Sequence, residues 1–253
     1  MGIDWFLHFD AIYCLSLADN IQRRDLMIDE LRRVGILDSG ILHWKITVRN
    51  ALYQYIWQNP SFQCDEWWRG MEVNLNCTMG HYEIMLESLA RGFRRVLIIE
   101  DDIRFVKDQN YISRILAFLP DHNTDLPHYD ICLFDKNVSA RPRTSLHNAI
   151  NYARINAHYF DYSTAFLGST GCIALSERAM RRFVEQQERK FMPADFLTNR
   201  INAEGDVVND DGLHRVASIA NLAVQDMRLK GDRMNEVDRQ LYNGIADLTK
   251  YQL

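Results

Sequence analysis

Runs of mostly apolar residues alternate along this chain with stretches in which apolar residues recur every three or four positions. Continuous apolar runs are typical of strands that are buried on both faces of a parallel sheet. The runs lie at residues 11–17, 96–99, 129–134, 166–175 and 216–224. Together with the helices between them, they predict an α/β fold with a mainly parallel sheet flanked by helices.

The intervening stretches predict amphipathic helices. Asp19 or Asn20 is the expected N-cap of the first helix, and Gly35 ends it. Its apolar stripe consists of Ile21, Ile28, Leu31 and Val34. Further helices are predicted at residues 43–58, 79–90, 111–119 and 237–248, directly after Ser176, and in a short segment that begins at Pro193.

A single large domain is expected to span residues 1–226, because a chain of 253 residues fits one α/β domain with a small appendage. Residues 227–253 are charged and mixed. They predict a partly helical C-terminal extension that packs on or near this domain. Residues 136–161 are polar with weak patterns, and we interpret them as a long substrate loop.

Charge, apolar run lengths and cysteine spacing indicate which partners and which compartment to expect. A formal net charge of -5 argues against nucleic acid as a partner. No apolar run approaches the roughly 18 to 20 residues that cross a membrane, so membrane contact is expected to be peripheral at most. Residues 1–9 lack the basic segment of a signal peptide, and the five cysteines form no CxxC pair. These features predict a cytoplasmic protein in a reducing compartment, with any membrane contact at the inner face.

The strand predicted at residues 96–99 runs directly into three carboxylates, Glu100, Asp101 and Asp102. Open α/β sheets bind their ligands outside the carboxyl ends of such strands. Strand alternation places Glu100 and Asp102 on one side and Asp101 on the other. A divalent cation that carries a phosphorylated ligand would neutralise these like charges. A strand end that enters solvent explains the same residues.

The turn after the first strand contains neither GxGxxG nor GxxxxGK[ST], which excludes a Rossmann fingerprint and a P-loop there. Five other blocks occur in order, at residues 15–24, 76–83, 96–102, 169–176 and 192–195. In this order they resemble the family 25 glycosyltransferases, which include bacterial lipooligosaccharide galactosyltransferases and the galactosyltransferase domains that modify collagen. Each block alone is weakly specific, and five in order are considerably more specific.

The resemblance implies a GT-A-like fold, a doubly wound sheet that binds a nucleotide-sugar at its strand ends. It implies transfer of a sugar from a UDP-sugar, with galactose as the expected sugar. The implied acceptor is a hydroxyl of a glycan or glycolipid, as in the synthesis of lipopolysaccharide-type glycans. Mn²⁺ or Mg²⁺ is the expected cofactor, because carboxylates are natural ligands of these ions and the ion neutralises the leaving diphosphate.

Within the implied site, Asp102 is expected to bind the metal directly, and Glu100 to bind it directly or through water. The residues expected to contact the nucleotide-sugar are Leu17, Arg23, His81, Glu100, Asp101 and Gly171. Four of these positions have open structural alternatives, namely a cap at Asp101, a solvated charge at Arg23, a hydrogen-bonded histidine at His81 and a bulge at Gly171.

Transfer with inversion needs a general base near the acceptor hydroxyl. Asp195 is the predicted catalytic base, because it lies in the block at residues 192–195 and near a predicted helix N-terminus, whose dipole keeps it ionised. A carboxylate held in this way is a weaker base, so Asp195 has a second interpretation as a group that positions the acceptor. Asp210 and Asp211 are the other candidates, in a string that also fits an ordinary turn.

Two departures from the family pattern lie near this site. Gly80 stands where the family has Ser, and Ala18 stands where it has Asp. They motivate a second hypothesis, a catalytically inactive homologue that acts as a binding module. A third hypothesis is a metal-dependent hydrolase, which would cleave the nucleotide-sugar rapidly without an acceptor.

Overall fold

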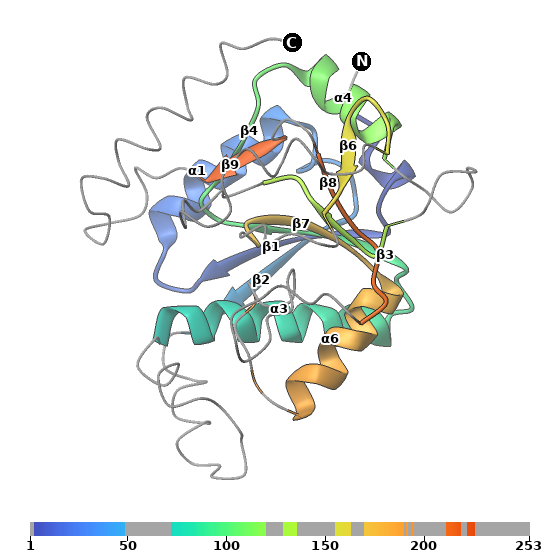
Figure 1. Ribbon diagram of the computed structural model, residues 1–253. Coiled ribbons are helices and arrows are strands. Elements are labelled where there is room, and N and C mark those ends of the chain that lie inside the picture. Colours follow the sequence, from blue (N-terminus) through green and yellow to red (C-terminus); the bar gives the residue numbers. More distant parts are fainter. Residues whose placement is uncertain are drawn as a thin grey trace, which may run out of the picture.

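The computed structural model describes residues 3–48, 72–119, 129–135, 155–162, 170–189, 191, 194, 211–218 and 222–225. Seven strands form one sheet in the order β2-β1-β3-β7-β5-β8-β6 (Figure 1). Their bounds are β1 Ala11–Leu17, β2 Leu42–Thr47, β3 Arg95–Glu100, β5 Ile131–Leu133, β6 Tyr159–Asp161, β7 Cys172–Ser176 and β8 Arg215–Ser218. A second, two-stranded sheet pairs β4 (Ile103–Phe105) with β9 (Ala223–Gln225).

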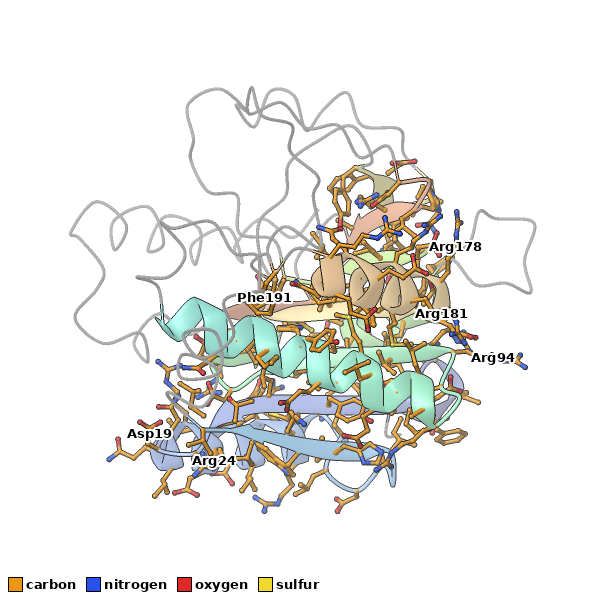
Figure 2. All side chains as sticks on the ribbon, turned by 90° about the horizontal axis from the view of Figure 1, so that it is seen from below. Asp19, Arg24, Arg94, Arg178, Arg181 and Phe191 are labelled. Carbon is orange, nitrogen blue, oxygen red and sulfur yellow. The ribbon has the colours of Figure 1, made fainter. Side chains whose placement is uncertain are left out.

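Most strands of the large sheet run in one direction. β1 pairs in parallel with β2 and β3, and β5 pairs in parallel with β8. β7 is antiparallel to both β3 and β5, and β6 is antiparallel to β8. The carboxyl ends of β1, β2, β3, β5 and β8 therefore lie at one edge of the sheet, where β7 begins. In Figure 2, Asp19 and Arg24 mark this edge, and Arg94 marks the opposite one.

Helices cover both faces of the large sheet. α3 (Glu72–Ala90) and α6 (Glu177–Arg189) lie side by side on one face, which is seen from below in Figure 2. α1 (Ile21–Arg33) and α4 (Gln109–Ala117) lie on the other face with β4 and β9 (Figure 1). A 3-10 turn, η1 (Trp5–Leu7), precedes β1. None of the described helices is long and apolar enough to cross a membrane.

The side chains of the central strands divide between two apolar cores. On β3, Leu97 and Ile99 face the core under α1 and α4. Val96 and Ile98 face the core under α3 and α6, and all four side chains are fully buried. This burial on both faces explains why the strands are continuous apolar runs in the sequence. The predicted class, a mostly parallel α/β sheet flanked by helices, is confirmed.

Two predictions of strands and helices are wrong. The helix predicted at residues 43–58 is replaced at its beginning by strand β2, which pairs with β1 along its whole length. This long-range pairing decides the conformation, because strand formation depends on neighbouring strands more than on local pattern. The strand predicted at residues 216–224 is two strands, β8 and β9, which belong to different sheets.

Other boundaries shift without changing the type of element. α3 begins at Glu72 instead of Met79. The buried face of α1 consists of Met27 and Leu31, whereas Ile21 of the predicted stripe is 61% exposed. The predictions for residues 49–58, 136–154, 163–169, 192–193, 195 and 226–253 lie outside the described residues, and these include the start of the helix predicted at Pro193.

Candidate functional site

Buried carboxylates gather at the sheet edge where β1, β3 and β5 end. β3 ends at Glu100, and Asp101 and Asp102 form the turn that follows it. Asp135 follows shortly after β5, and Gly171 immediately precedes β7. Asp101, Asp102 and Asp135 are each no more than 5% exposed. An edge of this kind, at the carboxyl ends of parallel strands, is the usual ligand site of an open α/β sheet.

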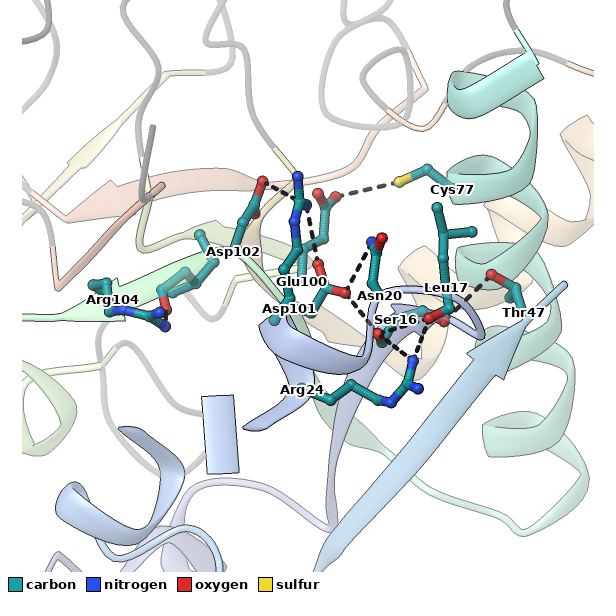
Figure 3. Close-up of polar contacts among 12 residues, drawn as sticks. Ser16, Leu17, Asn20, Arg24, Thr47, Cys77, Glu100, Asp101, Asp102 and Arg104 are labelled. Carbon is teal, nitrogen blue, oxygen red and sulfur yellow. Dashed lines mark hydrogen bonds and ion pairs between the residues drawn. The ribbon is translucent and has the colours of Figure 1, made fainter. Parts of the chain in front are cut away.

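Asp101 is bound by side chains from β1 and α1, as Figure 3 shows for Ser16 and Asn20. Ser16 Oγ donates to Asp101 Oδ2 at 2.6 Å, and Asn20 Nδ2 donates to the same oxygen at 3.4 Å. Arg23 Nη1 donates to Asp101 Oδ1 at 3.3 Å. Asn20 occupies the N-cap position of α1 but makes no capping hydrogen bond with its side chain. Asp101 therefore fastens the turn between β1 and α1 to the end of β3.

Asp102 shares the same guanidinium. Arg23 Nη1 lies 3.6 Å from Asp102 Oδ2, and the Arg23 side chain is 25% exposed. Strand alternation predicts Asp102 on the side of Glu100, but β3 ends at Glu100. The turn after it brings Asp102 within ion-pairing distance of Arg23, next to Asp101. Strand alternation therefore does not extend to Asp102, and the expectation that Glu100 and Asp102 share a metal stays a prediction.

Glu100 faces α3, on the opposite side from Asp101, as alternation predicts. Its Oε1 accepts a hydrogen bond from Thr170 Oγ1 at 2.9 Å. The same oxygen lies 3.3 Å from Cys77 Sγ and 3.3 Å from His81 Nε2. Burial raises the pKa of the Glu100 carboxyl, but the contact with His81 and the other two hydrogen bonds outweigh burial and lower the pKa to about 2. Glu100 is therefore ionised at neutral pH.

Two residues of α3 explain the shape of this side of the site. His81 is fully buried inside α3 and contacts Glu100, so it is not at a helix start. Gly80 lies against β1, where an added Cβ would be 2.4 Å from Leu15 Cδ1. The position at which the family has Ser is therefore filled here by the Leu15 side chain.

Gly171 permits a close approach to the acidic edge. A Cβ at this position would lie 2.4 Å from Asp135 Oδ2 and 2.7 Å from Ile103 Cδ1. The Gly171 carbonyl accepts a hydrogen bond from the Glu100 backbone N–H at 2.8 Å. Asp135 was not among the residues predicted from sequence. The sequence did indicate Asp135, because it comes at the end of a buried apolar run, as Glu100 does. It was missed because no other acidic residue is adjacent to it in the sequence.

Leu17 contributes its backbone to the site. Its carbonyl accepts a hydrogen bond from Arg24 Nη1, and Arg24 Nη2 donates to the Ala18 carbonyl at 2.8 Å. The Ala18 N–H donates to the Thr47 carbonyl of β2 at 2.8 Å. Arg24 and β2 therefore fix the turn in which the family has an Asp, as Figure 3 shows for Arg24 and Leu17.

The predicted base candidates are only partly within the described residues. Asp195 and Asp210 lie outside them. The residue before Asp195, Ala194, is buried, and its N–H donates to Thr78 Oγ1 of α3 at 2.8 Å. Asp211 forms two hydrogen bonds with the buried Arg215 guanidinium, at 2.7 and 2.6 Å. Asp211 therefore has a structural partner, which weakens its candidacy as the base.

Carboxylate oxygens are ligands of the kind that Mg²⁺ and Mn²⁺ prefer. In the described part of the chain, one group of three His, Cys, Asp or Glu residues has ligand atoms within 4.8 Å of one another, namely Cys77, His81 and Glu100. The three consecutive acids do not form such a cage. Mg²⁺ is commonly held by one or two carboxylates together with phosphate oxygens, and Mn²⁺ also suits oxygen ligands. The Asp102 carboxylate can serve in this way.

Comparisons with known proteins point to one family. The model of glycosyltransferase family 25 (LPS biosynthesis protein) matches residues 9–198. The inactive glycosyltransferase 25 family member 3 of Homo sapiens is 26% identical over 197 residues, which cover 74% of this chain and 32% of that protein. The protein of the same name from Mus musculus is 31% identical over 126 residues, 45% of this chain and 19% of that protein. This chain therefore spans a third or less of these relatives.

Two solved structures are more distantly similar. A197 from STIV has a TM-score of 0.36 and 9% identity, and the match covers 84% of this chain and 82% of that chain. Mannose-1-phosphate geranyltransferase from Thermus thermophilus has a TM-score of 0.40 and 10% identity, over 88% of this chain and 79% of that chain.

Proposed function

The chain belongs to glycosyltransferase family 25, and we propose that it transfers a sugar from a UDP-sugar to a hydroxyl of a glycan or glycolipid. Galactose is the expected sugar. The observation that carries the proposal is the pairing of Asp101 and Asp102 with one guanidinium, that of Arg23, where β1 and β3 end. These two carboxylates outnumber the single cation, so a divalent ion would balance their charge and carry the diphosphate of a UDP-sugar.

The proposed roles follow from these contacts. Asp102 would bind Mn²⁺ or Mg²⁺ directly, and Glu100 would contribute through water. When bound, the ion supplies positive charge to the leaving diphosphate. Arg23 is partly exposed beside both carboxylates and would contact the same diphosphate. Asp101 would hold Arg23 in position, in addition to any contact with the ribose or donor sugar.

Asp195 is the proposed general base. It would accept the proton of the acceptor hydroxyl as the hydroxyl oxygen attacks the anomeric carbon and UDP leaves. The observation that supports this role is the hydrogen bond from the N–H of Ala194, the residue before Asp195 in the sequence, to Thr78 Oγ1 of α3.

A panel of UDP-sugars tests the proposal. The protein is incubated with Mn²⁺ and each UDP-sugar, with and without candidate glycan acceptors, and the released UDP is measured. We expect release that depends on both metal and acceptor, with UDP-galactose as the preferred donor. Equally rapid release without any acceptor would instead identify a nucleotide-sugar hydrolase.

A catalytically inactive binding module is the second candidate function. Two observations favour it: the similar human and mouse proteins carry the word inactive in their names, and Leu15 fills the space at Gly80. This candidate predicts no UDP release with any donor and acceptor in the panel.

A further inference from the structure

Cys77, His81 and Glu100 converge between α3 and the end of β3. Cys77 and His81 are one helical turn apart, so both side chains lie on the same face of α3. Their ligand atoms and a carboxylate oxygen of Glu100 all lie within 4.8 Å of one another. Figure 3 shows the Cys77 side chain pointing toward Glu100. The group thus combines a thiol, an imidazole and a carboxylate at one point.

One carboxylate oxygen of Glu100 receives three contacts. Oε1 of Glu100 contacts Thr170 Oγ1, Cys77 Sγ and His81 Nε2. A carboxylate oxygen offers about two lone pairs. The Thr170 hydroxyl uses one of them at 2.9 Å, so the thiol and the imidazole compete for the other at 3.3 Å. A single cation in place of their two protons would satisfy the sulfur, the nitrogen and the oxygen together.

Two spacings within this group are close to those of a tetrahedral zinc ion. Zinc bonds of about 2.0–2.1 Å to nitrogen and oxygen and about 2.3 Å to sulfur put a nitrogen–oxygen pair about 3.3 Å apart and a sulfur–oxygen pair about 3.5 Å apart. The distances from Glu100 Oε1 to His81 Nε2 and to Cys77 Sγ are both 3.3 Å. Thiolate and imidazole ligands favour zinc over magnesium and manganese. We propose that Cys77 Sγ, His81 Nε2 and Glu100 Oε1 bind Zn²⁺.

The proposed ion keeps a fourth position open. Three protein ligands with an open position are typical of zinc sites that bind water or a substrate atom, whereas structural zinc sites have four protein ligands. The Glu100 side chain is 18% exposed, so water or an oxygen of a bound ligand can reach this position. All three described contacts use Oε1 of Glu100, which leaves Oε2 for the water-mediated contact toward an ion at Asp102.

Metal loading of the full chain tests the proposal. The protein is stripped with a chelator and titrated with Zn²⁺ or Co²⁺, and the bound metal is measured by mass spectrometry and absorption. We expect one zinc ion per chain and, with Co²⁺, a thiolate-to-cobalt charge-transfer band. Cys77→Ser removes the band and weakens zinc binding by about tenfold or more. Cys132→Ala, at another cysteine on the buried strand β5, retains both.

Two further variants separate this site from its neighbours. Thr170→Val removes the hydroxyl that orients Glu100, and it should weaken zinc binding by about 10- to 100-fold, with recovery in Thr170→Ser. Asp102→Asn leaves zinc binding unchanged, because Asp102 is not one of the three proposed ligands and its carboxylate pairs with Arg23. Measurements of zinc binding therefore test this site separately from the proposed transferase activity.

The absence of a thiolate-to-cobalt band in the wild-type protein would overturn the proposal. Zinc binding by Cys77→Ser that equals that of the wild type would also overturn it. If Cys77→Ser does not fold, alkylation of the wild type decides the question. Zn²⁺ should slow the reaction of Cys77 with iodoacetamide, mapped by peptide mass spectrometry, whereas an equal rate with zinc and with chelator contradicts the site.

Discussion

At the scale of residues, Arg23 connects the two consecutive aspartates. Its guanidinium is 3.3 Å from Asp101 and 3.6 Å from Asp102. Sequence patterns identified all three residues but not this arrangement, because the turn after Glu100 breaks the alternation of a strand. The sequence patterns did not indicate the partners of Glu100 either. The spacing of Cys77 and His81 fits one helix face, but nothing local indicates which strand end that face contacts.

Removal of the Arg23 charge should destabilise the protein and make its stability depend on a bound metal ion. In Arg23→Gln, two buried carboxylates lose their shared cation, which should lower the free energy of unfolding by about 1–3 kcal/mol. Mn²⁺ should then raise the melting temperature more in the variant than in the wild type. Arg32→Gln is the control, since it loses only an exposed pair with Asp29. An equal effect of Mn²⁺ on both variants would contradict this account of Arg23.

Restoring the family's serine at Gly80 should be unfavourable in this chain. Gly80→Ser places new atoms against Leu15, and such overpacking should cost about 1–3 kcal/mol in urea unfolding. Leu15→Val removes the atoms that clash, so the double variant should be more stable than the sum of the single effects predicts. Strictly additive effects would show that Leu15 does not fill the position of the serine.

At the scale of elements, predictions succeeded where a strand is buried on both faces. β1 was predicted with its observed bounds, Ala11–Leu17, and the main runs of β3, β5 and β7 were identified. β2 was missed because its residues are only partly buried and it pairs with β1 alone in the described sheet. Local periodicity favours a helix there, and the pairing that overrides it is not local.

A buried ion pair at the beginning of β8 should contribute strongly to stability. Asp211 binds the fully buried Arg215 with two hydrogen bonds. Asp211→Asn removes the carboxylate charge that faces this buried guanidinium, which should lower the free energy of unfolding by about 3–5 kcal/mol. Glu177→Gln, which removes the exposed pair with Arg181 on α6, should change it by less than about 1 kcal/mol. Similar losses in both variants would refute the structural role of Asp211.

At the scale of the whole molecule, the sheet assembles the site from distant segments. Ser16 and Arg23, the acids at 100–102 and Gly171 meet because parallel strands end at one edge. The sequence was sufficient to predict the fold class and this edge. It was insufficient to predict that Asp135 lies at the site or which residues contact Glu100. Both depend on the order of strands in the sheet and on how α3 packs against it.

Calorimetric titration of UDP, with Mn²⁺ and with chelator, tests the central claim most directly. We expect the wild type to bind UDP at least about tenfold more tightly with Mn²⁺, a difference of ~1.4 kcal/mol. Asp102→Asn should lose this dependence while its melting curve stays close to that of the wild type. UDP affinity that is the same with and without metal in the wild type, or metal dependence that survives in Asp102→Asn, would contradict the proposed site.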